Sequence, residues 1–281
     1  MKSLPDIPPV AAAPSELLES GHLWILESVV GAPLRFRLAE SGIIEFGDDD
    51  RVYTDPDGLP PQYSHAVRHI RSNLDREALR AAVDDASEIV FFGTAMQYRG
   101  LDYDWERTPS FLGQEIWSAT NKQFRPPDAV EGIFDRLGLQ AVNPLVQELA
   151  ARDFDPDRYP IPASAWYDGS AAGIVIRDKA GNRARRPNPA VTVDDSPQTA
   201  ATTADELAGS YGSVDRLSRL VSQSSGTTQT IGADQLFERA FESAVRELHP
   251  RVFGPAGPVE RAAFRSVLAA RSAEFIRNNT V

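Results

Sequence analysis

The chain has 281 residues, of which 42% are hydrophobic, with a formal net charge of −11 and no cysteine. This length suits one large domain or two small ones, and the lack of cysteine excludes disulfides, thiolate zinc sites and thiol nucleophiles. No apolar run is long enough to span a bilayer, and residues 1–14 lack the apolar segment of a signal peptide. We therefore expect a cytoplasmic protein without a membrane partner.

The predicted elements of the first half are mainly strands. A lead-in at residues 1–20 ends in a short helix near 15–20. Alternating or continuous apolar residues predict strands at 22–30, 33–38, 43–46, 88–93 and 111–117. Helical spacing of apolar residues predicts one or two helices within 62–87 and another at 127–137.

The second half changes character after residue 194. We predict a helix at 144–152, a strand at 173–177 and a basic turn with a strand at 181–189. A polar segment at 195–203 is interpreted as a linker. Beyond it, helical periodicity predicts helices at 204–222, 233–249 and 257–277. The predicted organisation is thus a lead-in (1–20), an α+β domain (21–194), a linker (195–203) and a helical domain (204–281).

The basic residues are strongly biased toward arginine: the chain has 26 arginines and only three lysines, Lys2, Lys122 and Lys179. An acidic surface poor in lysine is typical of a high-salt cytoplasm, where salt screens self-repulsion. We therefore expect a halophilic protein. A codon bias toward arginine is the alternative, and it does not explain the acidity.

Isolated residue patterns give little chemistry. His65 and His69 are four apart in a predicted helix, a spacing that suits two metal ligands, but no third ligand is evident nearby, so we predict no metal site. A nucleophile elbow and a glycine-rich phosphate loop with a lysine are both missing. Composition and spacing alone therefore indicate only an α+β protein.

Six segments carry a more specific pattern. They are residues 24–36 (with Glu27-Ser28-Val29-Val30-Gly31), 44–51, 90–94, 110–117, 172–177 and 183–186. In order and spacing these segments resemble the motifs of the RNA ligase family of covalent nucleotidyltransferases, in particular RNA ligase-like proteins of halophilic archaea. The resemblance implies an α+β nucleotidyltransferase core of ATP-grasp-like antiparallel sheets, followed by a small C-terminal all-helical domain.

The resemblance also implies a set of site residues. In the family, the first motif reads Glu-Lys-x-Asp-Gly, and its lysine attacks ATP and carries AMP; Ser28 stands at that catalytic position. Phe111 is implied to stack on adenine and Arg51 to contact ribose. The nucleotide-binding residues implied by the resemblance are Glu27, Gly31, Arg51, Thr94, Phe111, Glu115, Gly173, Val175 and Arg185.

The chain departs from the family at the positions that carry the chemistry. A serine hydroxyl ionises far above neutral pH, whereas a desolvated lysine amine can form a P–N bond. Thr94 and Ala172 stand where the family has carboxylates, and a methyl or hydroxyl group does not hold a hard cation as a carboxylate does. Further changes are Val30 for Asp, Gln114-Glu115 for Phe-Asp and Arg185 for Lys. Lys122 and Lys179 lie outside the motifs, so we do not expect either to replace the missing nucleophile.

Three hypotheses follow. We favour an RNA ligase-like pseudoenzyme that is defective in lysine adenylylation and binds nucleotide or RNA ends. The alternatives are an active RNA ligase or nucleotidyltransferase with rearranged catalytic groups, and a scaffold that reuses the fold and binds a protein partner through its C-terminal helices. ATP and Mg are expected as cofactors only if the family activity is retained.

Overall fold

A computed structural model describes residues 1–53, 55, 58–193, 203–223, 231–250, 252–253, 257 and 259–279. The chain divides into two compact units. The larger comprises Met1–Met96 and Asp102–Val193, and the smaller comprises Gln97–Leu101 and Asp194–Val281. The linker expected at 195–203 lies outside the described residues, apart from Thr203.

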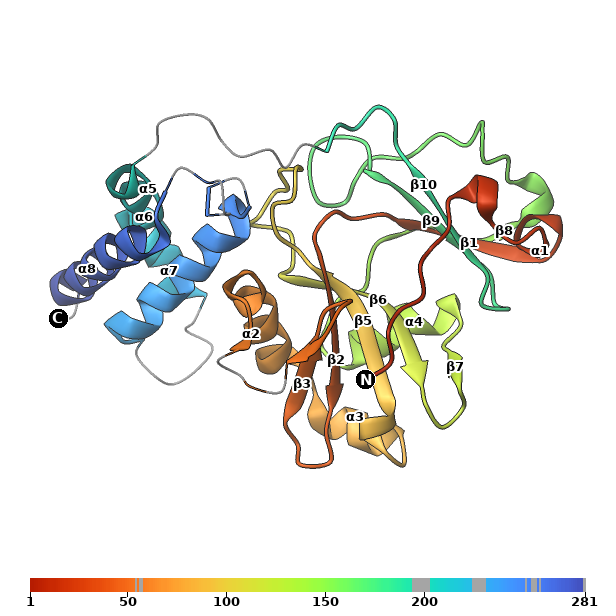
Figure 1. Ribbon diagram of the computed structural model, residues 1–281, viewed down its shortest axis with the longest axis horizontal. Helices are drawn as coiled ribbons and strands as arrows, with labels where there is room; N and C mark the ends of the chain where they lie inside the picture. Colours follow the sequence, from red (N-terminus) through yellow and green to blue (C-terminus); the bar gives the residue numbers. More distant parts are fainter. Residues whose placement is uncertain are drawn as a thin grey trace. The chain divides into compact units, whose positions relative to one another are not determined.

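The first sheet of the larger unit has four antiparallel strands in the order β10-β9-β1-β8 (Figure 1). These strands are β1 (His22–Glu27), β8 (Pro144–Ala150), β9 (Gly173–Arg177) and β10 (Arg183–Pro187). Leu23, Ile25, Ile174 and Ile176 alternate onto one face and form a core with α1 (Glu16–Glu19). The opposite face therefore receives Trp24, Leu26, Val175, Arg177, Arg183 and Arg185.

The second sheet has six antiparallel strands in the order β4-β3-β2-β5-β6-β7. The strands are β2 (Ala32–Leu38), β3 (Ile44–Gly47), β4 (Val52–Tyr53), β5 (Ile89–Ala95), β6 (Phe111–Ser118) and β7 (Gln123–Phe124). One face packs into a core with α2 (Ser64–Asn73), α3 (Arg76–Ala82) and α4 (Pro127–Arg136). We call the other face, which bears Thr94 and Glu115, the cleft face.

The predicted helix at 144–152 is wrong, because Pro144–Ala150 forms strand β8. Its residues favour a helix locally, but pairing with β1 supplies the segment with backbone partners, so tertiary context overrides local propensity. The pairing is irregular, with two register shifts, and Glu148 has a φ of 57°. These irregularities remove the regular alternation by which a strand is recognised in a sequence.

The smaller unit is helical, with α5 (Ala204–Tyr211), α6 (Val214–Ser222), α7 (Ala233–Leu248) and α8 (Arg261–Asn279). The segment predicted as one helix at 204–222 is therefore two. Thr203 and Glu206 form a reciprocal capping box at the start of α5. A membrane-crossing helix, which needs length and apolarity together, is not found in the described part of the chain.

Candidate functional site

The first predicted motif lies where β1 ends and the chain leaves the four-stranded sheet. The amide of Glu27 donates to the Asn143 carbonyl at 2.9 Å, and that of Ser28 donates to the Gly173 carbonyl at 3.0 Å. Ser28 is half-buried. The structure thus brings Glu27, Ser28 and Gly173 together, with the Ser28 backbone held by the first residue of β9.

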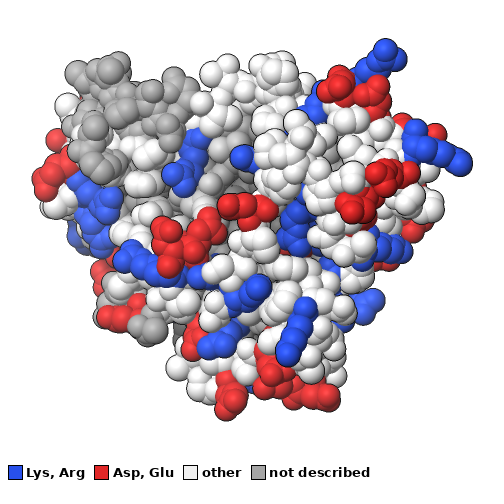
Figure 2. Space-filling view, turned by 45° about the vertical axis from the view of Figure 1, so that its right-hand side comes forward, with Lys and Arg blue, Asp and Glu red and all other residues white. Residues whose placement is uncertain are grey.

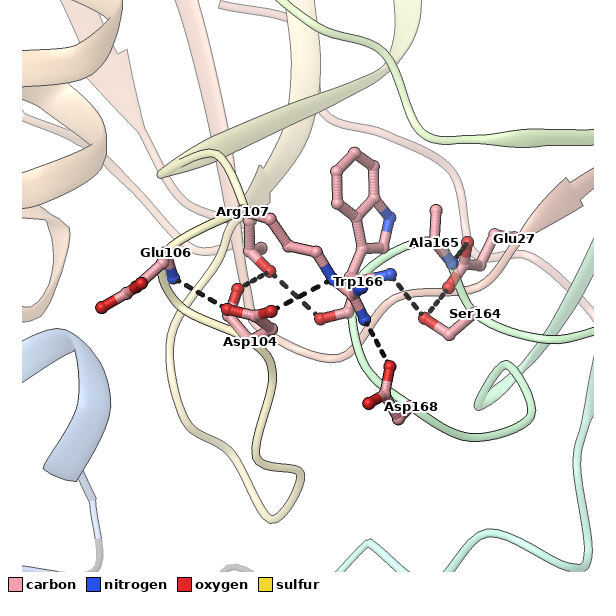
Figure 3. Close-up of polar contacts among 9 residues, drawn as sticks. Glu27, Asp104, Glu106, Arg107, Ser164, Ala165, Trp166 and Asp168 are labelled. Atoms are coloured by element: carbon pink, nitrogen blue, oxygen red, sulfur yellow. Dashed lines mark hydrogen bonds and ion pairs between the residues drawn. The ribbon is translucent and has the colours of Figure 1, made fainter.

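The carboxylate of Glu27 is an organising group. Only 1% of this residue is exposed, and its oxygens accept hydrogen bonds from Ser164 Oγ (2.5 Å) and the Ala165 amide (3.1 Å) (Figure 3). Asn143 Nδ2 donates a third hydrogen bond at 3.2 Å. Three donors satisfy a buried carboxylate that would otherwise be costly to bury. Glu27 therefore fixes the loop at 163–170 and has little capacity left to act as a base for Ser28.

A second loop, at 102–110, closes over the same region. The Asp104 amide donates to the Trp166 carbonyl at 2.8 Å, and Arg107 pairs with both Asp104 (3.4 Å) and Asp168 (3.2 Å) (Figure 3). Sequence reasoning missed this pair of loops, because neither has a periodic or motif-like pattern. Only their folding against β1 shows that they belong together.

The amide of Val30, two residues after Ser28, donates to the Tyr103 hydroxyl at 2.7 Å. Burial raises the pKa of Tyr103 well above its usual value, so the phenol stays protonated at physiological pH. Tyr103 also packs edge-on against Trp105 and Tyr167, with ring centroids 5.7 Å apart in both pairs. A phenol and an aromatic cluster thus surround the backbone that follows Ser28.

Gly31 and Thr94 are brought into direct contact. A Cβ added at Gly31 would overlap Thr94 Cγ2 and the Ala95 carbonyl, so only glycine fits where β2 begins beside β5. The Thr94 hydroxyl accepts a hydrogen bond from Gln114 Nε2 at 3.1 Å. This hydrogen bond ties β5 to β6 on the cleft face.

The cleft face carries a buried ion cluster that joins the two sheets. Glu115 of β6 pairs with Arg177 of β9 at 2.7 Å and with Arg183 of β10 at 3.2 Å. The exposed fractions of the three side chains are 3%, 3% and 9%. Arg177 also donates to the carbonyls of Gln114 (3.3 Å) and Arg125 (3.2 Å).

Burial dominates the electrostatics of this cluster. It raises the pKa of Glu115, and the two guanidinium groups act in the opposite direction. Burial likewise lowers the pKa of Arg177, against the stabilising effect of Glu115. Glu115 pairs with both arginines, and all three side chains are buried, so neither guanidinium faces solvent in this conformation.

The remaining predicted residues are dispersed. Val175 and Arg185 are paired across β9 and β10, and Arg185 is exposed. Arg51 lies on the exposed turn between β3 and β4, where its guanidinium stacks 4.9 Å above the Tyr53 ring. The structure does not bring Arg51 together with the residues around Ser28.

Phe111 also lies away from the predicted cluster. Its side chain is fully buried in the core behind the six-stranded sheet, against Phe36 and Phe134. Phe111 and Glu115 are four residues apart and would share a face in a regular strand, but a bulge intervenes, because Phe92 pairs with Glu115 and Gly93 with Gly113. The bulge turns Phe111 toward the helices, so its ring has no free face for a base.

The three lysines are accounted for separately. Lys179 pairs with Asp128 at 2.7 Å, and this hydrogen bond raises its pKa, opposite to the change that makes an amine nucleophilic. Lys122 is exposed on the turn between β6 and β7. Lys2 lies over the Trp117 ring, 4.7 Å from its centroid. The contacts of these three lysines therefore give no sign that any of them serves as a nucleophile in place of Ser28.

The described residues contain no cluster of three or more His, Cys, Asp or Glu that could hold a metal ion. An open-mouthed pocket of about 290 Å³, solvent included, lies between Trp24, Leu26, Gln114, Pro144 and Arg177, among other residues. On the face drawn in Figure 2, the basic and acidic side chains of the described residues are interspersed. The groups that the structure places in contact with Ser28 and Glu27 offer neither an amine nor a carboxylate free of hydrogen bonds.

Comparison with solved structures identifies the architecture. A point mutant of the Naegleria gruberi RNA ligase with ATP and Mn matches with a TM-score of 0.52 and 12% identity, covering 68% of this chain and 57% of that one. An archaeal ATP-dependent RNA ligase matches with a TM-score of 0.50 and 15% identity, covering 99% of this chain and 66% of that one. The chain therefore spans less than two thirds of either protein.

No protein-family model matches the sequence, and no curated protein does. At such low identity the structural likeness establishes the fold alone. The chain has an α+β, RNA ligase-like nucleotidyltransferase fold built on antiparallel sheets, with helices at its C-terminal end.

Proposed function

We propose that this chain is an RNA ligase-like protein that does not adenylylate itself and acts by binding nucleotide or RNA ends. The observation that carries the proposal is the place of Ser28 directly after β1, where its amide donates to the Gly173 carbonyl. The motif resemblance sets this residue at the position of the family's lysine. A hydroxyl at this point needs a general base to become a nucleophile. The adjacent carboxylate, Glu27, already accepts three hydrogen bonds.

The surroundings of Ser28 support the same proposal. Thr94 and Ala172 supply no carboxylate for a divalent ion, and Glu115, a carboxylate of the cleft face, is paired with two arginines. Adenylyl transfer depends on electrostatic stabilisation of the phosphates. ATP and Mg would serve as cofactors only in the active alternative.

The setting proposed for this function is a halophilic cytoplasm. The support is compositional: a net charge of −11 with three lysines among 29 basic residues. Binding assays therefore need to be run at low and at molar salt. This matters for RNA, because added salt weakens phosphate contacts.

The test combines labelling with binding. Wild type, Ser28→Ala and Ser28→Lys are incubated with ATP labelled in its α-phosphate and with Mg or Mn, and the protein is examined for covalent label. Equilibrium binding of ATP and of 5′-phosphorylated single-stranded RNA is measured on the same samples. We expect wild type and Ser28→Ala to bind ligand without becoming labelled.

The outcomes separate the three hypotheses. Label on the wild type that is lost in Lys122→Asn or Lys179→Ala would support the active enzyme with rearranged groups. Failure of all three proteins to bind ATP or RNA would favour a scaffold whose C-terminal helices contact a protein partner. Label confined to Ser28→Lys would agree with the proposal, because it would place residue 28 at the position of the nucleophile.

A further inference from the structure

The cleft face carries an aromatic surface that the sequence motifs do not include. Trp117 of β6 pairs with Phe124 of β7, and their rings meet edge-to-face with centroids 4.9 Å apart. Phe92 of β5 lies 5.9 Å from Phe124. The Arg183 guanidinium lies 4.5 Å from the Phe124 centroid on the same face. We call Trp117 and Phe124, together with Arg35 of β2 on the same face of the sheet, the β6–β7 platform.

Arg35 places a positive charge on this platform. It pairs across β2 and β5 with Phe92, which in turn pairs with Glu115 of β6, so these three residues form one row across the sheet. Arg35 is only 5% exposed although it sits in the middle of a strand. Aromatic rings beside arginines are the usual elements of a surface that binds single-stranded nucleic acid, where bases stack and phosphates meet cations.

The N-terminal segment, residues 1–9, covers the platform. The Lys2 ammonium lies 4.7 Å from the Trp117 ring centroid. Arg35 Nη1 donates to the Lys2 carbonyl (3.1 Å) and to Ser3 Oγ (2.6 Å). Farther along, the Arg185 amide donates to the Pro8 carbonyl at 2.8 Å. In Figure 1 the segment starts at β5 and β6 and runs toward β10.

The contacts that residues 1–9 make with Arg35 and Trp117 are weaker than those that a phosphate and a base would make. A neutral carbonyl and a hydroxyl hydrogen-bond to Arg35, although a phosphate would make stronger, charge-assisted bonds. An ammonium occupies the Trp117 face on which a base can stack. The segment also brings Asp6 near Asp49, whose pKa is raised mainly by burial, is lowered by Arg35, and is raised further by Asp48, Asp50 and Asp6.

We infer that the β6–β7 platform is a binding site for the end of a single-stranded RNA, and that residues 1–9 occupy it as an autoinhibitory segment. A base stacks on Trp117 and a phosphate contacts Arg35 once Lys2 and Ser3 have left. The inference rests on the proposed function, which supplies RNA as the ligand. It adds the location of the site and the competition with the protein's own N-terminal segment.

This competition predicts that removing a particular lysine strengthens RNA binding, which is the opposite of the usual effect. Removing a lysine ordinarily weakens RNA binding, because it removes a phosphate contact or lowers the local positive potential. Lys2→Ala instead releases residues 1–9 from the platform. If this makes the uncovered state about five to ten times more populated, RNA affinity is expected to rise by about fivefold to tenfold. Ser3→Ala is expected to act in the same direction without any change in charge.

The experiment measures the affinity of full-length protein for 5′-phosphorylated single-stranded RNA by fluorescence anisotropy, at low and at molar salt. The variants are Lys2→Ala, Ser3→Ala, Trp117→Leu and the control Lys122→Asn. The control removes one exposed lysine near the platform, and asparagine tolerates its positive φ of 51°. Circular dichroism confirms that each variant is folded. Limited proteolysis at the N-terminus, with and without RNA, reports release of the segment.

We expect tighter binding for Lys2→Ala and Ser3→Ala, weaker binding for Trp117→Leu, and equal or weaker binding for Lys122→Asn. RNA should also accelerate N-terminal cleavage of the wild type. If RNA binds the wild type but Lys2→Ala and Ser3→Ala do not tighten it, the inference fails while the proposed function stands. If RNA binds none of the proteins, the inference fails and so does the RNA-binding part of the proposed function.

Discussion

Replacing Glu115 by glutamine tests the buried ion cluster that joins the two sheets. The carboxylate forms ion pairs with both Arg177 and Arg183, and all three side chains are at least nine-tenths buried. Glu115→Gln keeps the size and one acceptor oxygen but leaves two buried guanidinium groups without a counter-charge. Breaking a buried ion pair from one side costs about 3–5 kcal/mol, so we expect a loss of about 3 kcal/mol because glutamine retains some hydrogen bonding.

The assay is thermal and urea unfolding of the full chain. For a unit of this size a loss of about 3 kcal/mol lowers the melting temperature by about 10 °C. The matched control is Glu45→Gln, which breaks the Arg37–Glu45 pair on the same sheet; both side chains there are 34% exposed. The expected loss for that control is below about 1 kcal/mol. Equal losses for the two variants would refute the reasoning.

Three further predictions concern other parts of the fold. Gly31→Ala should lower stability by about 1–3 kcal/mol because its Cβ would overlap Thr94, whereas Gly132→Ala, with open space in α4, should be neutral or stabilising by up to about 1 kcal/mol; equal melting temperatures would contradict this. Burial and neighbouring arginines hold the pKa of His249 at about 4, so between pH 6.5 and 4 the unfolded chain takes up a proton that the folded chain does not. The free energy of unfolding should therefore decrease by about 1–2 kcal/mol as the pH is lowered from 6.5 to 4, after allowance for solvent exposure. Urea unfolding measures this, and the same pH dependence in wild type and His249→Asn would contradict it. Glu27→Gln should weaken its bonds to Ser164 and Ala165 and speed proteolysis within 163–170, and unchanged cleavage would show that Glu27 does not hold that loop.

The strands could be predicted from the sequence because their apolar residues follow the period of a sheet. This holds for β1, β2, β5, β6 and β9. Strand β8 could not be predicted, because its residues favour a helix and its partner, β1, lies more than 100 residues earlier in the chain. Long-range pairing therefore decided an element whose local propensity pointed elsewhere.

The site was predictable in part. The order of motifs placed Glu27, Ser28 and Gly173 together, as the structure has them. The side of the sheet on which Phe111 lies was not predictable, because one extra residue in β6 reverses the alternation of side chains. In the local sequence, only Gly113 indicates a bulge. The ion cluster around Glu115 offered only a weak signal, a carboxylate inside an apolar strand.

The N-terminal segment was the least predictable feature. Residues 1–9 have no periodicity, and their contacts with Arg35 and Trp117 depend on the finished sheets. A segment without its own secondary structure is positioned by the surface that it meets. Its role could be inferred only after the cleft face had been described.

The most direct test of the central claim is the intact mass of the protein after incubation with ATP and a divalent ion. The account predicts an unchanged mass for the wild type at low and at molar salt, because Ser28 stands where an amine would be required. A wild-type species heavier by one adenylyl group would contradict it.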